Sequence, residues 1–199
     1  MSELKRGTHC FQAAVPWGEN FQKKFKLMSC RALPVRLINE RQHHNHMTTN
    51  NTNTVRLHRV LRATPERIYR AFLDADAMAK WLPPNGFTGK VHHVDAKVGG
   101  GYKMTFTNFT TGKGHSFGGT YLELKPHERI RYTNVFDTPG LPGEMLTSIT
   151  LKQVFCGTEV NITQEGIPAM IPAEACYLGW QESLILLGKL VEAEIPDQP

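Results

Sequence analysis

A chain of 199 residues is long enough for one domain with a substantial core and too short for two ordinary domains with a linker. The first 46 residues contain eight of the 23 Lys/Arg and three of the 18 Asp/Glu. The rest of the chain therefore contains 15 basic and 15 acidic residues. The rest of the chain therefore lacks the basic surface of a nucleic-acid binder, and no apolar run approaches the about 20 residues of a membrane span.

The four cysteines show no C-x-x-C spacing and are divided evenly between the first 46 residues and the rest. This spacing predicts neither a zinc site nor a disulfide framework. A secretory signal needs an apolar run of about 7–15 residues near the N-terminus. The stretch from Cys10 to Val15 is interrupted by Gln12 and closed by Pro16. We therefore expect a cytoplasmic protein with reduced thiols.

The first 46 residues carry no sustained period of two or of 3.6, and they end in the polar run from Arg41 to His46. A polar leader, residues 47–53, follows. We expect residues 1–46 to be a disordered tail or an upstream extension, with Met47 as the natural start. Their basic, acid-poor composition also fits an organelle-targeting segment, although no amphipathic helix is evident. The folded domain is expected to span residues 54–196.

A strand and two short helices are expected at the start of this domain. Apolar residues sit between basic ones from residue 55 to 61, which predicts a strand with one exposed face. Thr64-Pro65 fit the N-cap and the first position of a helix. Asp74 or Asp76 starts a second helix, which Pro83-Pro84 end.

Six strands with short connections follow, and such connections favour antiparallel pairing. They are expected at residues 91–98, 102–109, 116–124, 130–136, 146–155 and 159–165. A long helix is expected from about Pro172 to about Ile195. At about 100° per residue, one of its faces holds Ala173, Tyr177, Trp180, Leu184, Leu187 and Val191, and the opposite face holds Glu174, Glu182, Lys189 and Glu192. This pattern predicts an α+β fold.

Five sequence features occur in a fixed order along residues 55–195. They are the run from Thr64 to Phe72, Trp81, the run from Val98 to Tyr102, the run from Gly119 to Leu124 with Pro126, and the run from Gly179 to Leu184. In this order they resemble the Activator of Hsp90 ATPase homologue 1-like family, the branch of the START-like superfamily that includes small polyketide-cyclase-like proteins. The resemblance implies a helix-grip fold, in which a curved antiparallel sheet wraps around a long C-terminal helix.

The resemblance also implies a cavity between the sheet and the long helix, opening near the short helices. Alternation along each strand indicates which side chains point inward. We expect the ligand-binding residues to be Trp81, His92, Tyr102, Met104, Phe106, Tyr132, Asn134, Phe136, Ile149, Ile162, Gln164, Tyr177, Trp180 and Leu184. Trp81 is expected near the mouth. A few convergent polar groups in an apolar cavity are typical of a small-molecule site. The alternative is a filled core whose polar groups satisfy one another or hold water.

No metal site, cofactor or catalytic residue is assigned. Adjacent strand residues point to opposite faces, so His92 and His93 cannot chelate one ion together, and at most His92 faces the cavity. The histidines of the tail lack companion ligands. The sequence has no G-x-S-x-G motif. Gly99 to Gly101 precede a strand rather than a helix, which indicates a tight turn instead of a phosphate site.

We therefore expect non-catalytic binding of a small hydrophobic or aromatic ligand, either lipid-like or similar to a polyketide or flavonoid. A cyclase-like or hydrolase-like enzyme acting on such a ligand is the second hypothesis. A cofactor of Hsp90 is the third, although the Hsp90 activator carries an additional N-terminal domain that residues 1–46 are too few to supply. A homodimer is left open, and neither nucleic acid nor a membrane is expected as a partner.

Overall fold

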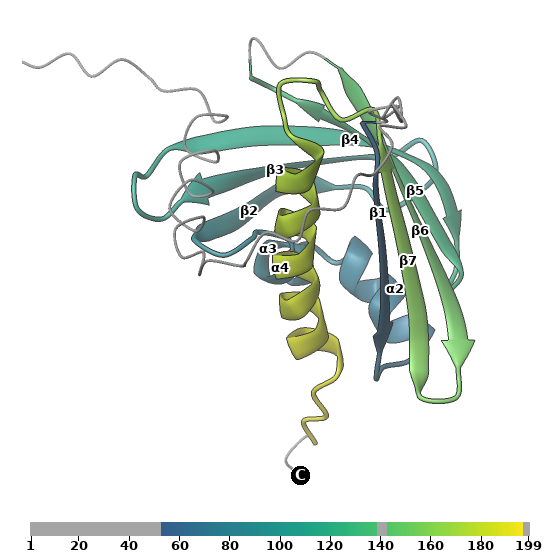
Figure 1. Ribbon diagram of the computed structural model, residues 1–199. Coiled ribbons are helices and arrows are strands. Elements are labelled where there is room, and N and C mark those ends of the chain that lie inside the picture. The colour runs from purple at the N-terminus through teal and green to yellow at the C-terminus, as the bar shows by residue number, and fades with distance from the viewer. Residues whose placement is uncertain (1–52, 139–142, 197–199) are drawn as a thin grey trace, which may run out of the picture. The chain divides into compact units, whose positions relative to one another are not determined.

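A seven-stranded antiparallel sheet is the main element of the structure, a computed structural model that describes residues 53–138 and 143–196 (Figure 1). Its strand order is β1-β7-β6-β5-β4-β3-β2. The elements are β1 (Val55–Leu61), α2 (Pro65–Leu73), α3 (Ala75–Trp81), β2 (Phe87–Val94), β3 (Gly101–Asn108), β4 (Gly114–Lys125), β5 (Arg129–Phe136), β6 (Glu144–Val154), β7 (Gly157–Glu165) and α4 (Ala173–Val191). The predicted α+β class and order of elements are confirmed, whereas the predicted tail lies outside the described residues.

The two short helices begin at the predicted capping residues. Thr64 Oγ1 accepts a hydrogen bond from the backbone N–H of Arg67 at 3.4 Å, and Pro65 is the first helical residue of α2. Asp74 Oδ1 accepts from the backbone N–H of Ala77 at 2.8 Å, so Asp74, rather than Asp76, caps α3. These side chains satisfy amide groups that a helix start leaves without a partner.

Strand β2 begins and ends earlier than predicted and contains a bulge. Val91 lies opposite Met104, whereas His93 lies opposite Lys103, so the register shifts by one residue between Val91 and His93. The segment 95–100 after β2 forms the predicted tight turn, in which the backbone N–H of Asp95 donates to the carbonyl of Gly101 at 2.8 Å. A bulge reverses the facing of side chains beyond it, and this affects the predicted site.

The long helix α4 contacts β1, α2 and α3 and lies on the concave side of the curled sheet (Figure 1). Leu184, Leu187 and Val191 are buried, as its periodicity predicts. Glu182 was expected on the opposite face, but its Oε2 accepts from the backbone N–H of Asn85 at 3.0 Å, because the chain after α3 passes beside α4. No helix in the described part of the chain combines the length and apolar character needed to cross a membrane.

Candidate functional site

Three tyrosines lie together on the inner face of the sheet, the face toward α4. Tyr102 comes from β3, Tyr121 from β4 and Tyr132 from β5, and all three are buried. Their ring centroids are 5.7 Å apart for Tyr102 and Tyr121, 5.5 Å for Tyr102 and Tyr132, and 6.1 Å for Tyr121 and Tyr132. Gly119 lies opposite Tyr102. A Cβ on Gly119 would lie 1.7 Å from the carbonyl oxygen of Thr133, so this close approach of β4 and β5 requires glycine.

Four polar residues form a continuous cross-strand row on this face. Tyr121 pairs with Tyr132, Tyr132 with Thr147, and Thr147 with Gln164. We call these four residues the polar row. Because neighbouring strands are about 4.8 Å apart, the row extends roughly 14 Å from β4 to β7. Trp180 of α4 closes its β7 end, since its Nε1 donates to Gln164 Oε1 at 2.9 Å.

Most polar atoms around the row satisfy one another. The Tyr102 hydroxyl donates to Asn134 Oδ1, and Asn134 Nδ2 donates to Thr147 Oγ1 at 2.9 Å. Gln164 Nε2 makes a contact of 3.7 Å with the sulfur of Met145. This agrees with the alternative that inward polar groups satisfy one another. For Asn134 and Gln164, burial by itself therefore does not indicate a ligand.

Within the polar row, Tyr121 is the exception. Its side chain is 1% exposed, yet its hydroxyl has no hydrogen-bond partner among the described residues. Burial raises the pKa of Tyr121 to about 12, so the hydroxyl keeps its proton at physiological pH. A buried hydroxyl without a partner costs about 1–3 kcal/mol. The inner face therefore holds one hydroxyl whose hydrogen-bond donor is not used by the described residues.

The other two tyrosines also remain protonated. Burial raises the pKa of Tyr102, and the neighbouring Tyr132 and Tyr121 raise it further. Burial also raises the pKa of Tyr132, and the neighbouring Tyr121 raises it further. A hydrogen bond with Thr147 lowers the pKa and so opposes this shift. All three hydroxyls are thus neutral, and only that of Tyr121 lacks a partner among the described residues.

An aromatic group lies on the inner face beyond the tyrosines. Phe106 meets Phe117 at a centroid distance of 4.8 Å, and Phe117 meets Phe136 at 6.1 Å. His115, opposite Phe106 in the register, contacts the rings of Phe106 and Phe87 at 5.9 and 5.8 Å. Burial lowers the pKa of His115 to about 4, so its imidazole is neutral at pH 7.

The family model for Activator of Hsp90 ATPase homolog 1-like protein matches residues 62–192. The chain belongs to this family. A crystal structure of a Chromobacterium violaceum protein is 63% identical with a TM-score of 0.71, and the match covers 71% of this chain and 99% of that one. A Nitrosomonas europaea protein matches at 19% identity with a TM-score of 0.61, over 70% of this chain and 94% of that one. The comparison with curated proteins found no match.

A second solved member with the family's name shares the fold at low identity. The solution structure of the AHSA1-like protein from Aeromonas hydrophila is similar to this chain at 20% identity, with a TM-score of 0.58. The match covers 70% of this chain and 92% of that one. At such identity the likeness shows the fold alone, and the family membership confirms the resemblance identified from the sequence.

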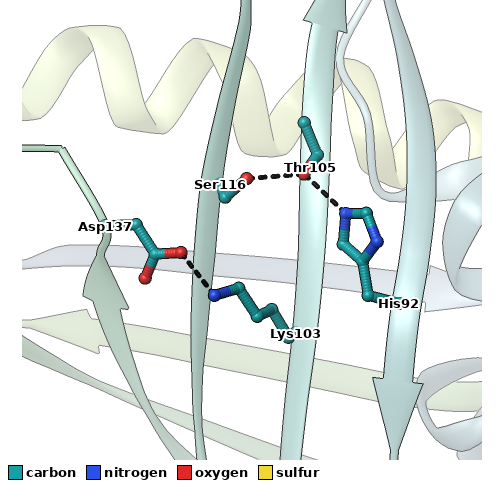
Figure 2. A network of polar contacts seen from close by, with 5 residues as sticks. All are labelled: His92, Lys103, Thr105, Ser116 and Asp137. Atoms are coloured by element: carbon teal, nitrogen blue, oxygen red, sulfur yellow. Dashed lines mark hydrogen bonds and ion pairs between the residues drawn. The ribbon is translucent and has the colours of Figure 1, made fainter.

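In this family member, His92 faces the outer side of the sheet, contrary to the prediction. Its Nε2 lies 2.8 Å from Thr105 Oγ1, which in turn lies 2.6 Å from Ser116 Oγ (Figure 2). Thr105 alternates with the inward Met104, so the contact places His92 outside. The bulge in β2 explains the error, because simple alternation from Val94 does not hold across it. On the same face, Lys103 forms an ion pair with Asp137 at 2.8 Å (Figure 2).

Two other predicted site residues lie elsewhere than expected. Tyr177 is 42% exposed, because the buried face at the start of α4 passes through Ala175 instead. Trp81 is 0% exposed and therefore not at a mouth. Its Nε1 donates to the carbonyl of Ala71 at 2.8 Å, and its ring meets Phe72 at 4.8 Å, so it joins α3 to α2.

The remaining predicted residues fall into three groups. The structure brings Tyr102, Tyr132, Asn134, Gln164 and Trp180 into or beside the polar row, and Phe106 and Phe136 into the aromatic group. Met104, Ile149, Ile162 and Leu184 are buried apolar core residues. In the described ranges no group of three or more His, Cys, Asp or Glu is placed to hold a metal ion.

Sequence reasoning missed Tyr121 and His115. Tyr121 was noted in the run from Gly119 to Leu124, but its facing was not assigned. Tyr121 lies two residues after Gly119 and four after Phe117, so the three residues share one face of the strand. This even spacing was the available signal for the inward facing of Tyr121. His115 was missed because the strand was expected to begin at Ser116, whereas β4 begins at Gly114.

Proposed function

We propose that this domain binds a small, uncharged aromatic or hydrophobic molecule that carries an acceptor oxygen, and that it does so without covalent chemistry. The START-like fold of the family supports a ligand-binding domain in general. The observation that carries the proposal is the buried Tyr121 hydroxyl, which has no partner among the described residues. A carbonyl or ether oxygen above the polar row would accept its hydrogen bond.

The chemistry of the inner face supports a neutral ligand. The polar row contains no Lys or Arg that would compensate the charge of a carboxylate. Its tyrosines keep their protons because their pKa values are raised. Burying an unpaired charge costs far more than burying a hydroxyl, so an anion would bind poorly here. The phenylalanines beside the tyrosines offer ring contacts to an aromatic ligand body.

The ionisation states of Cys176 and the tyrosines also support binding rather than turnover. Burial raises the pKa of the Cys176 thiol to about 11, so this cysteine is not a thiolate nucleophile at pH 7. The raised pKa values of the tyrosine hydroxyls likewise keep them protonated at pH 7. A covalent mechanism needs an activated nucleophile with an adjacent base, which these residues do not provide. The proposal requires neither Hsp90, nucleic acid nor a membrane as a partner.

A matched pair of probes tests the proposal. The compounds 9-fluorenone and fluorene have the same ring skeleton, and the ketone carries one acceptor oxygen. We expect wild type to bind the ketone more tightly, and Tyr121→Phe to lose about twofold to tenfold of that preference, the worth of one neutral hydrogen bond. Binding is measured by ligand-detected NMR, and mass spectrometry of the recovered probes detects turnover.

The control is Tyr177→Phe, which removes a hydroxyl from an exposed tyrosine of α4. It should leave both affinities unchanged. An unaltered preference in Tyr121→Phe would show that Tyr121 does not contact the ligand. Absence of binding of both probes to wild type would contradict the proposed ligand class, and a changed probe mass would favour the enzyme hypothesis.

A further inference from the structure

A groove of about 650 Å³ lies between α2 and the turn that joins β4 to β5. Its volume is within the range of about 300–1,000 Å³ that is usual for small-molecule sites. It is lined by Thr64, Glu66, Arg67, Tyr69, Arg70, Leu73, Asp74 and His127. None of these residues belongs to the polar row or the aromatic group, so the groove is a second candidate site.

His127 forms the wall of the groove in a costly backbone conformation. Its φ is 62°, and no other non-glycine residue in the described ranges has a positive φ. The imidazole lies 3.5 Å from Glu66 Oε1, and its ring meets Tyr69 edge to face at a centroid distance of 5.5 Å. Strained residues of this kind often occur at ligand sites. A glycine would adopt this conformation without steric strain but would leave the groove without the imidazole that forms its wall.

Three of the four charged side chains from α2 and its ends already have partners. Glu66 faces His127, and hydrogen bonds from its own backbone amide and from Thr64 lower its pKa, so it remains a carboxylate. Asp74 caps α3. Arg67 donates to the carbonyl of Ala193 at 2.6 Å. The guanidinium of Arg70 has no hydrogen bond or ion pair within the described part of the chain.

The groove therefore combines an apolar floor with one uncommitted cation. Tyr69 and Leu73 are half-buried and supply an aromatic and an aliphatic surface. Burial raises the pKa of Tyr69, so its ring is neutral. The planar guanidinium of Arg70 can bind a carboxylate through two parallel hydrogen bonds. Glu66 would repel an anion from its own end of the groove, and Asp74, the other acid of the lining, has its Oδ1 bound to the backbone N–H of Ala77.

We propose that this groove binds a small aromatic carboxylate, with its ring against Tyr69, Leu73 and His127 and its carboxylate on Arg70. The site complements the inner face, which has neutral donors and favours an uncharged ligand. The inference does not depend on the proposed function, because the two sites share no residue. Substitutions in one site are therefore not expected to change the affinity of a ligand for the other site.

The test uses 2-naphthoate as the probe and 2-naphthamide as its uncharged counterpart, with binding followed by ¹H–¹⁵N NMR of the full chain. We expect naphthoate to shift the amide signals of residues 64–74 and 125–129. Arg70→Gln should weaken naphthoate binding about fivefold to tenfold and leave the weaker naphthamide binding unchanged. The matched control Arg56→Gln, an exposed arginine of β1, should bind naphthoate like wild type.

His127→Gly separates a binding role from a structural one. Because glycine relieves the positive φ, this variant should unfold at a higher Tm and yet bind naphthoate more weakly. If His127→Gly bound naphthoate as tightly as wild type, His127 would not contact the ligand. Equal affinities of Arg70→Gln and Arg56→Gln, or shifts confined to the inner face, would overturn the site. Tyr121→Phe should leave the response of residues 64–74 unchanged.

Discussion

Tyr121 differs from its two tyrosine neighbours in what its hydroxyl contacts. Tyr102 bonds to Asn134, and Tyr132 interacts with Thr147, so each contributes its polar atom to the network on the inner face. Tyr121 is equally buried and adds ring contacts, but its hydroxyl gains nothing from the described residues. A phenylalanine would pack in the same space without that cost. The hydroxyl is therefore better explained by binding than by stability.

His115 should make stability depend on pH. Its pKa is lowered by burial to about 4, whereas an unfolded histidine has a pKa of about 6.5. The folded state thus favours the neutral ring. This contribution is fully present above pH 6.5 and is lost as the pH falls toward 4. Between pH 8 and pH 5, linkage gives a loss of about 2 kcal/mol from this group.

Urea unfolding of wild type and His115→Gln at pH 8 and pH 5 measures this effect. The glutamine does not titrate, so the variant should lose about 2 kcal/mol less than wild type over the interval. Titratable groups that are the same in both proteins cancel in this comparison. The same pH dependence in both proteins would show that His115 is not held neutral by the fold.

At the scale of elements, α4 is apolar on more than one side, and its burial distinguishes the sides. Leu184 is buried, whereas its neighbour Ile185 is 51% exposed. Leu184→Ala should lower the free energy of unfolding by about 2–5 kcal/mol, because it leaves a cavity beneath the helix. Ile185→Ala should change it by less than about 0.5 kcal/mol. Urea denaturation compares the two, and equal losses would mean that the helix is rotated from the observed orientation.

The elements were largely predictable from the sequence because local residues specify them. Thr64, Asp74 and the glycines from Gly99 to Gly101 act within a few residues of their own position. The facing of side chains was predictable where strands are regular, as for Tyr102 and Asn134. It failed at His92, because a bulge depends on the partner strand and leaves no clear mark in one strand's sequence.

The candidate site was less predictable than the fold. Its polar row depends on which residues of β4, β5, β6 and β7 stand opposite one another. That register is a property of four strands together, whereas alternation describes one strand at a time. The groove beside α2 was not predicted at all. It needs His127, which lies about 60 residues after the helix in sequence, to contact Glu66 and Tyr69.

At the scale of the whole molecule, the two candidate sites differ in charge as well as place. The inner face offers the neutral Tyr121 hydroxyl, while the groove offers the Arg70 guanidinium. One chain could therefore bind an uncharged and an anionic aromatic compound independently. Because neither site draws on the other's residues, the tests with fluorenone and naphthoate can be run on the same set of variants and read separately.

The last prediction concerns residues 1–45, which lie outside the described residues. The start of the domain is held by the sheet itself: β1 pairs with β7 from Val55 to Leu61, and the carbonyl of Asn53 accepts from the backbone N–H of Ile167 at 3.1 Å. Deleting residues 1–45 leaves all these contacts in place. We expect the free energy of unfolding in urea to stay within about 1 kcal/mol of the full chain. Deletion through Leu61 should instead prevent folding, because it also removes the apolar strand beneath α4. A loss of more than about 1 kcal/mol in the shorter deletion would show that residues 1–45 stabilise the domain.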